Sequence, residues 1–401
     1  MNSVHSQMVA VRAPAHWKPV RLKFLIDMFG GGTPSKSDPG YWAGDIPWVS
    51  PKDMKRPTVH DTEDHISAAA LVETATRRVE AGSVLVVVRS GILQHTLPVA
   101  INSVAVALNQ DMKALSCRAA LRPRYLFYVL SGLQSDLLMS WRMLGATVDS
   151  IDVERMRNTL LWVPPEQEQL RIIEYLDRET ARIDSLIAAR KRLADLLQER
   201  FHIQCVVALG LAGTLGEGRR LAAYATVTLG RQRSPEQSVG PFMTRYLRAA
   251  NVKDGQLDLT DVMTMNFNPT EQKVFGLADR DILVSEGAGS LEAVGAAAVW
   301  HEDLAGVVCF QNTLLRLRPR PGTDPDYLAW WCRGAFFSGL LAAIASGANI
   351  FHLSAERMKS LRMDPPDLAS QVQIARDLEA AEVRTRTAVE QLSRQLASIF
   401  Q

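Results

Sequence analysis

The sequence has few of the residues that build metal centres, disulfide frameworks or membrane spans. Its 401 residues include four cysteines, which are widely spaced and form no Cys-x-x-Cys pair. The eight histidines show neither the spacing of a metal-ligand set nor that of a catalytic triad. The longest strictly apolar runs, such as 84–88, are far shorter than a membrane span, and the first residues lack a signal-peptide core. We expect a cytoplasmic protein with reduced thiols, no bound metal and no membrane partner.

Motifs for enzyme chemistry are incomplete. Residues 30–37 come within one residue of a phosphate-binding loop, but Ser35 replaces the second glycine and Pro34 removes a backbone N–H donor. Residues 287–289 lack the third glycine of a dinucleotide fingerprint. The Asp-Pro-Pro-Asp run at 364–367 lacks the aromatic residue with which amino-methyltransferases stack on a flipped base. The sequence therefore predicts no catalytic residue in this chain.

A strong excess of positive charge is also missing. The net charge is +2, which is low for a protein that grips nucleic acid alone. Residues 1–165 carry 18 Lys and Arg against 14 Asp and Glu, whereas residues 205–366 carry 16 of each. If DNA is the partner, local clusters must bind it, or other subunits must share the binding.

What the chain does contain is a repeat at a spacing of 201 to 202 residues. The matching segments are Val163-Pro164-Pro165-Glu166 with Asp364-Pro365-Pro366-Asp367, Glu168-Gln169-Leu170-Arg171-Ile172 with Ser370-Gln371-Val372-Gln373-Ile374, Glu154-Arg155-Met156 with Glu356-Arg357-Met358, Tyr125-Leu126 with Tyr327-Leu328, and Asn109-Gln110-Asp111 with Phe310-Gln311-Asn312. The period is too long for a solenoid array and indicates two copies of one unit in a pseudo-two-fold molecule.

Each copy starts with mixed material and ends in a helix. Short β-branched runs, Gly and Pro punctuation and brief helical patterns predict an α+β globular segment, because the regular alternation of a doubly wound sheet is missing. We therefore expect globular segments at 1–165 and 205–366, each a mixture of helices and strands. Long helices are expected at 166–204 and 367–401.

Heptad patterns follow both Pro-Pro pairs, and the 202-residue offset maps one pattern onto the other. The two apolar stripes can be buried against each other, so we expect the helices to form an antiparallel coiled coil. In the alternative, each helix packs only on its own globular segment. The residues expected to pack between the helices are Ile173, Leu176, Ile183, Ile187 and Leu197 in the first helix and Leu378, Val389, Leu392, Leu396 and Ile399 in the second.

Polar, basic and aromatic clusters lie in the loops at the start of each globular segment. Arg, Asn and Gln make bidentate contacts to base edges, while Lys, Ser and Thr hold phosphates. In the competing interpretation, the tryptophans belong to the core and the charges are solvated. The candidate DNA-binding residues are Thr33, Ser35, Lys36, Trp48, Ser50 and Lys52 in the first half and Arg231, Gln232, Arg233, Arg245, Arg248, Asn251 and Lys253 in the second.

Four of these segments, in order, resemble a known family. Residues 31–36 with 41–54 are similar to the opening of a target-recognition domain from the specificity subunit of Type I restriction-modification systems. Residues 229–235 with 246–252 resemble the opening of a second such domain, of a different subtype. The Pro-Pro segments resemble the entry into the spacer helices of that family. The resemblance covers nearly the whole chain beyond its first 15 or so residues.

The resemblance implies a non-catalytic subunit that reads a split, asymmetric sequence in double-stranded DNA, with the two helices fixing the gap between half-sites. It implies two modification subunits that methylate adenine at N6 with S-adenosylmethionine, and restriction subunits that use ATP and Mg²⁺. No cofactor is expected in this chain. Two alternatives stay open: an adaptor whose paired helices assemble partners without reading DNA, and a specificity subunit of a methylation-only system.

Overall fold

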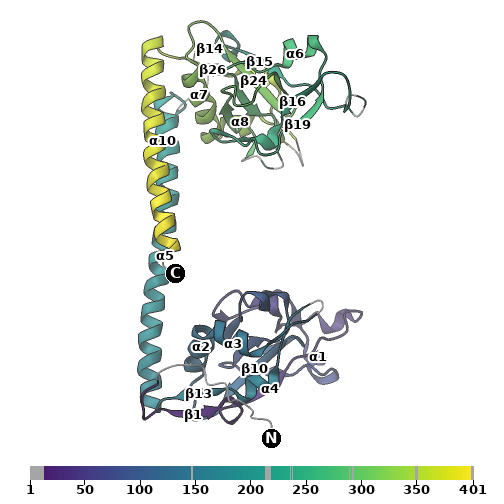
Figure 1. The fold of residues 1–401 in the computed structure, drawn as a ribbon, viewed down its shortest axis with the longest axis vertical. Coiled ribbons are helices and arrows are strands. Elements are labelled where there is room, and N and C mark those ends of the chain that lie inside the picture. The colour runs from purple at the N-terminus through teal and green to yellow at the C-terminus, as the bar shows by residue number, and fades with distance from the viewer. Residues whose placement is uncertain are drawn as a thin grey trace. The chain divides into compact units, whose positions relative to one another are not determined.

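The computed structural model describes residues 13–145, 148–212, 218–234, 236, 238–288, 290, 293–347 and 351–398. Ile399, one of the residues expected to pack between the helices, lies outside these ranges. The chain divides into two compact units, residues 1–184 and 185–401 (Figure 1). The boundary falls inside one long helix, α5 (Glu166–Ala208), so the structural division differs from the expected domain boundary near residue 165.

Unit 1 is built on two sheets. The five-stranded sheet has the order β2 (Ile26–Gly30), β10 (Met112–Cys117), β7 (Val84–Val87), β8 (Val99–Asn102) and β4 (Thr58–Val59). The four-stranded sheet has the order β5 (His65–Ile66), β3 (Ile46–Val49), β9 (Val106–Leu108) and β6 (Arg78–Val79). Every residue of β7 is fully buried, which explains its uninterrupted apolar sequence. A two-stranded pair, β1 (Lys18–Arg21) and β13 (Leu160–Val163), immediately precedes the Pro-Pro turn into α5.

Short helices cover the unit 1 core: α1 (Ala68–Glu73), α2 (Pro123–Gly132), α3 (Gln134–Trp141) and α4 (Val153–Asn158). Helix α2 begins with a proline in its first turn, where the missing N–H costs no hydrogen bond. It buries Tyr125, Leu126, Phe127 and Leu130 and packs against β7 and β8. A small pair, β11 (Arg142–Met143) and β12 (Ser150–Ile151), lies between α3 and α4 in the chain.

Unit 2 repeats this plan. Its four-stranded sheet has the order β15 (Ala225–Leu229), β24 (Leu314–Pro319), β20 (Ile282–Ser285) and β22 (Ala297–Val299), which is the order of β2, β10, β7 and β8 in unit 1. A second sheet contains β19 (Met263–Asn266), β16 (Met243–Leu247) and β23 (Val308–Phe310). Three pairs complete the strands: β14 (Arg219–Arg220) with β26 (Arg362–Met363), β17 (Val252–Lys253) with β18 (Gln256–Leu257), and β21 (Gly287–Ala288) with β25 (Phe351–His352). The duplication predicted from the sequence is confirmed by this shared strand order.

The helices of unit 2 are α6 (Pro269–Phe275), α7 (Pro325–Phe337), α8 (Leu340–Ile344), α9 (Ala355–Ser360) and α10 (Leu368–Ala397), together with the part of α5 that follows Asp184. Asp367 caps α10 by accepting a hydrogen bond from the Ser370 amide, so the predicted start of this helix is confirmed. Helix α5 continues to Ala208, four residues beyond the predicted end at 204. The mixture of helices and sheets confirms the α+β class.

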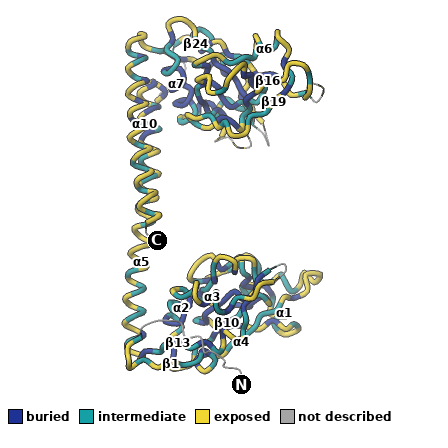
Figure 2. Tube along the Cα trace, viewed as in Figure 1, coloured by how far each residue is buried: buried dark blue, intermediate teal, exposed yellow. Residues whose placement is uncertain are grey.

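Helices α5 and α10 contact each other within unit 2. Phe201 and Cys205 of α5 belong to the same hydrophobic cluster as Leu378 and Ala381 of α10. Further back along α5, Arg190 donates to the Gln395 carbonyl at 3.3 Å, near the end of α10. The two helices therefore run antiparallel here, as the heptads predict. Figure 2 shows the cores of both units buried and much of α5 exposed.

Some of the expected packing residues fit a pair of helices packed on each other, and others fit a helix packed on its own globular segment. Within unit 2, Ile187, Leu197, Val389, Leu392 and Leu396 are half-buried, and Leu378 is fully buried. In unit 1, Ile173 packs against the core of its own globular segment, which corrects its assignment to the helix pair. Leu176 is half-buried, whereas Ile183 is 40% exposed. Helix α10 also packs along α7. The first turns of both long helices therefore pack on the adjacent globular segment.

Candidate nucleic-acid interface

In unit 1, four loops meet at one end of the five-stranded sheet. The Thr33 hydroxyl, after β2, donates to the Gln110 side chain just before β10. At the end of β7, the Val88 amide donates to the Asp111 carbonyl at 2.8 Å. Arg89 then forms a bridge with Ser150 at the start of β12. The exposed side chains of Thr33, Arg89 and Gln110 are thereby brought to one surface.

Unit 2 assembles the same loops at the corresponding end of its sheet. The Arg231 amide, after β15, donates to the carbonyl of Phe310, the last residue of β23, at 3.1 Å. At the end of β20, the Glu286 amide donates to the Thr313 carbonyl at 2.9 Å. Gly287 pairs with His352 of β25, which places the exposed His352 ring beside the same loops.

Glycine is required where the first loop leaves the sheet in each unit. A Cβ atom on Gly31 would lie 2.0 Å from the Asn109 carbonyl oxygen, and one on Gly230 would lie 2.1 Å from the Gln311 carbonyl oxygen. Both contacts are to backbone atoms that cannot swing away, so any larger residue would push the two loops apart. Close approach of these loops is therefore a shared feature of the two units.

The structure corrects two candidates in unit 1. Trp48 is 6% exposed and its indole N–H donates to the Gly32 carbonyl at 3.0 Å. Ser50 is also 6% exposed and its hydroxyl donates to Asp53 at 2.8 Å in a capping box. Both side chains hold the fold together and do not present polar groups to a ligand. For Trp48 this agrees with the competing interpretation, in which the tryptophans belong to the core. The sequence could not decide between the two interpretations, because a loop tryptophan or serine has the same local pattern whether buried or exposed.

The other unit 1 candidates lie on the surface. Thr33, Ser35 and Lys36 are exposed in the loop that follows β2. Lys52 is exposed but is engaged by Asp64 at 2.9 Å and Glu63 at 3.2 Å. The hydrogen bonds that Lys52 donates to Asp64 and Glu63 raise its pKa, and the two negative charges offset its positive charge. A base or phosphate contact by Lys52 would first have to displace those acids.

Two unit 2 candidates are also corrected. Arg231 is 7% exposed, with its guanidinium 2.8 Å from Glu271 and 2.6 Å from the Asn266 carbonyl. Asn251 is 2% exposed and its side chain bonds the backbone of Arg248, Asp258 and Asp261. These polar groups already have buried partners, so both residues act in the fold.

The remaining unit 2 candidates lie at the surface. Gln232, Arg233, Arg245 and Lys253 are exposed, and Arg248 is half-buried. Arg245 donates to the Ala305 carbonyl at 2.9 Å, while Arg248 pairs with Asp261. Sequence reasoning missed Arg89, Gln110, Gln311 and His352 at the loop clusters. The repeat itself contained a signal, because it aligns Gln110 with Gln311.

Comparisons with known proteins show similarity to one family over the first half of the chain. Residues 14–193 match the model of the Type I restriction modification DNA specificity domain. This match covers 180 of the 401 residues and makes the chain similar to the specificity subunits of Type I restriction-modification systems. The chain is 37% identical over 174 residues to the EcoR124I/EcoR124II specificity subunit of Escherichia coli, an alignment that covers 43% of each chain. It is 29% identical over 175 residues to the StySPI specificity subunit of Salmonella potsdam, covering 42% of this chain and 37% of that one. The chain thus spans less than half the length of these relatives.

Solved structures support the fold over nearly the full length. A chain from a study of the assembly and conformational transition of the Type I R-M system aligns with a TM-score of 0.70 at 15% identity, covering 97% of this chain and 95% of that one. The HsdS subunit from Thermoanaerobacter tengcongensis aligns with a TM-score of 0.56 at 14% identity, covering 98% and 97%. At these identities the likeness concerns the fold alone.

Other features of the chain bear on its chemistry. Burial raises the pKa of the Cys205, Cys309 and Cys332 thiols to about 12, so they are protonated and weakly nucleophilic at neutral pH. Among the described residues, no cluster of three or more His, Cys, Asp or Glu is placed to hold a metal ion. Within the same described part of the chain, no helix is long and apolar enough to cross a bilayer.

A basic hollow accompanies the positive surplus of unit 1. Lys23, Lys113, Arg118 and Arg157 line a hollow of 260 Å³ beside β2 and β10. Asp27 shares it and lies 2.6 Å from Arg118, whose hydrogen bond lowers the Asp27 pKa. Four cations against this one acid leave the hollow positive. Such a surface favours anionic ligands.

Proposed function

We propose that this chain is the non-catalytic DNA-recognition subunit of a Type I restriction-modification complex. It reads a bipartite, asymmetric sequence in double-stranded DNA, with one half-site for each globular unit. The observation that carries this proposal is the match of residues 14–193 to a DNA specificity domain, together with the same strand order in unit 2. The duplication gives one chain two globular units, each of which can bind one half-site.

Different side chains at equivalent loops support different half-sites. Unit 1 exposes Thr33, Arg89 and Gln110, whereas unit 2 exposes Gln232 and Arg233. Arg recognises guanine and Gln recognises adenine through bidentate hydrogen bonds in the major groove. The proposed contact set contains the exposed and half-buried candidates together with the newly found loop residues: Thr33, Ser35, Lys36, Lys52, Arg89, Gln110, Gln232, Arg233, Arg245, Arg248, Lys253, Gln311 and His352.

Recruitment of modification and restriction subunits completes the proposal. The unit 2 part of α5 carries a second apolar stripe that α10 leaves exposed, in which each side chain is 42–61% exposed: Leu186, Leu193, Leu196, Ile203 and Val207. Apolar side chains at heptad spacing on an exposed helix are typical of a surface that receives partner helices. Two modification subunits would then supply S-adenosylmethionine chemistry, and restriction subunits would supply ATP- and Mg²⁺-dependent cleavage, in the cytoplasm.

The proposal is tested by selection from a pool of random DNA duplexes. The chain, purified with a modification subunit encoded beside it, is incubated with the pool, and bound duplexes are sequenced. Enrichment of two fixed half-sites separated by an unspecified gap is the expected result. A complex that forms but enriches no sequence would instead identify an assembly adaptor. A genomic neighbourhood with a modification gene and no restriction gene would indicate a methylation-only system.

A further inference from the structure

Two buried glutamines occupy the same place in the two units. Gln169 lies in the first turns of α5 in unit 1 and is 1% exposed, and Gln371 lies in the first turns of α10 in unit 2 and is 2% exposed. They are 202 positions apart, which is the period of the sequence repeat. A buried amide must satisfy its hydrogen bonds inside the protein, so the partners reveal what each side chain does.

Both glutamines make the same three hydrogen bonds. In unit 1, Gln169 accepts from the Arg122 amide at 2.9 Å and donates to the carbonyls of Ala120 and Pro164 at 2.9 and 3.0 Å. In unit 2, Gln371 accepts from the Asp324 amide at 2.9 Å and donates to the carbonyls of Gly322 and Pro366 at 3.4 and 2.8 Å. Each partner in unit 2 is the residue 202 positions after its counterpart in unit 1.

The three bonds join the spacer helix to the globular segment. Arg122 and Asp324 directly precede α2 and α7, which belong to the globular cores, whereas Pro164 and Pro366 belong to the turns that enter α5 and α10. Only a glutamine suits this joint. Glutamate has the same shape but no donors for the two carbonyls, and asparagine is one methylene shorter.

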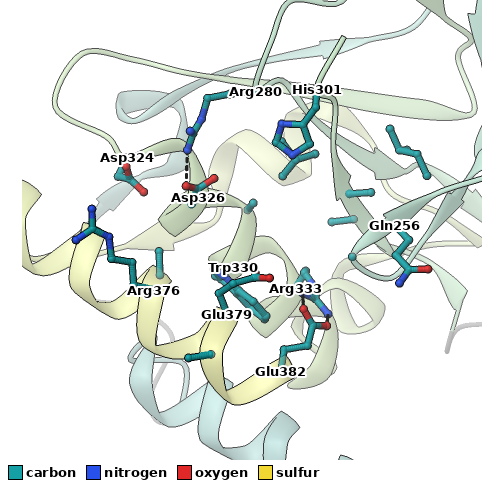
Figure 3. Close-up of a pocket in the computed structure, with 18 of the residues that line it drawn as sticks. Gln256, Arg280, His301, Asp324, Asp326, Trp330, Arg333, Arg376, Glu379 and Glu382 are labelled. Atoms are coloured by element: carbon teal, nitrogen blue, oxygen red, sulfur yellow. Dashed lines mark hydrogen bonds and ion pairs between the residues drawn. The ribbon is translucent and has the colours of Figure 1, made fainter. Parts of the chain in front are cut away.

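Each long helix makes a second set of polar contacts to its globular segment, and this set differs between the units. In unit 1, Asp177 of α5 accepts hydrogen bonds from Arg124 at 2.8 Å and from Tyr128 of α2. In unit 2, the buried Arg333 of α7 bonds Glu382 of α10 at 2.6 Å and Asp254 at 2.9 Å, beside a hollow of 1060 Å³ (Figure 3). A helix held at one point can pivot against its globular segment, whereas contacts at a second point fix its direction. The glutamine is the contact point that both units share.

We propose that Gln169 and Gln371 are positioning residues that hold each recognition segment at a fixed angle on its spacer helix and thereby fix the DNA gap between half-sites. This inference rests on the proposed function. One base pair more or less in the gap moves a half-site by about 3.4 Å and rotates it by about 36° around the duplex. A rigid joint makes that displacement costly, whereas a loosened joint lets the segment pivot and follow the displaced half-site.

The experiment uses the chain in complex with its modification subunits. Methyl transfer from labelled S-adenosylmethionine is measured on duplexes that carry the selected half-sites at the cognate gap and at gaps one base pair shorter and longer. Gln169→Met and Gln371→Met keep the approximate volume and remove all three hydrogen bonds. For each variant we expect the ratio of transfer at altered gaps to transfer at the cognate gap to rise about tenfold. Gln→Glu keeps the acceptor but turns a carboxylate oxygen toward the two carbonyls, so it gives a rise in the same direction.

Matched controls are the exposed glutamines one turn or less away, Gln167→Met in α5 and Gln373→Met in α10, and both keep the wild-type ratio. A purely structural role would lower transfer at all three gaps by the same factor, and an unchanged ratio in the Met variants contradicts the inference. If a Met variant is insoluble, its Gln→Glu counterpart is judged by the same ratio. If the wild-type complex methylates no duplex that carries the split site, the proposed function itself is contradicted. If wild type and variants all methylate only the duplex with the cognate gap, the inference alone is contradicted.

Discussion

The guanidinium of Arg231 lies 2.8 Å from the carboxylate of Glu271, and both side chains are withdrawn from solvent at 8% and 22% exposure. The same guanidinium lies over the Phe267 ring, 4.9 Å from its centroid. Two residues away, Arg233 is exposed. Two arginines in one loop, with the same residue type and nearly the same sequence context, therefore have different roles: Arg231 holds the loop to α6, and Arg233 faces the surface.

Substituting these two arginines separates folding from recognition. Arg231→Ala leaves Glu271 without its buried partner, so we expect it to lower the free energy of unfolding by about 2–4 kcal/mol. Arg233→Ala leaves stability unchanged and weakens DNA binding by about 1–3 kcal/mol. Urea denaturation and titration of the selected duplex measure the two effects. Unchanged DNA affinity in Arg233→Ala would remove this residue from the contact set.

The buried arginine of α7 provides a second test. Burial lowers the Arg333 pKa, but its bonds to Asp254 and Glu382 outweigh this effect and raise it, so the side chain is charged at all physiological pH values. Arg333→Met leaves two acids facing each other, and we expect a loss of about 3–5 kcal/mol of stability.

Arg280→Met is the control for this substitution. Arg280 lines the same hollow and pairs with Asp326 at 2.5 Å, but it is 39% exposed, so its loss costs at most about 1 kcal/mol. Chemical denaturation of both variants is compared with wild type. Equal losses would show that burial of the Arg333 bonds contributes nothing extra.

We expect the stability of unit 2 to depend on pH through His202. Its ring stacks on Phe337 with centroids 3.9 Å apart, and burial lowers its pKa below the ordinary 6.5, assisted by Arg333 and opposed by Asp254 and Glu382. Below pH 6.5 the unfolded chain binds a proton that the folded chain does not, so stability falls as pH drops through 6.5 toward the folded pKa. His202→Phe keeps the stacking and removes this dependence. Melting temperatures at pH 7.5, 6.5 and 5.5 measure it, and an equal slope in both proteins would exclude His202 as the source.

We expect the length of α5 to set the gap in the proposed DNA target. Helix α5 is continuous from Glu166 to Ala208. A seven-residue insertion after Asp184 preserves the heptad register and adds about 10.5 Å of helix. We expect the recognised gap to change by about three base pairs while both half-sites stay the same. Selection from random duplexes reads both quantities at once, and an unchanged gap would argue against a spacer role for α5.

Much of the fold can be predicted from the repeat. The Pro-Pro pairs mark the entries to α5 and α10 because proline ends the preceding strand and suits a helix start. The heptads predict the antiparallel pairing of α5 and α10, which bring Phe201 and Leu378 into one hydrophobic cluster of unit 2. The division of α5 between two units could not be predicted, because its amphipathic pattern continues without a break through Asp184.

The candidate site is harder to predict from the sequence than the fold. Arg231 is buried by Glu271, which lies 40 positions away, and nothing in the loop sequence distinguishes it from Arg233. Gln169 and Gln371 stand inside the repeated motif, so their positions were visible. Their role depends on carbonyls such as those of Ala120 and Gly322, which only the folded chain brings near. Burial and backbone partners are tertiary properties, and these decide which polar residues remain available to a ligand.

The most direct test is single-molecule sequencing of genomic DNA from cells that carry a modification subunit, with and without this chain. The account predicts new N6-methyladenine at one split, asymmetric motif that appears only when the chain is present. Both half-sites and the gap would be read in the same experiment. A soluble complex of chain and modification subunit that produces no new mark would contradict DNA recognition as the function of this chain.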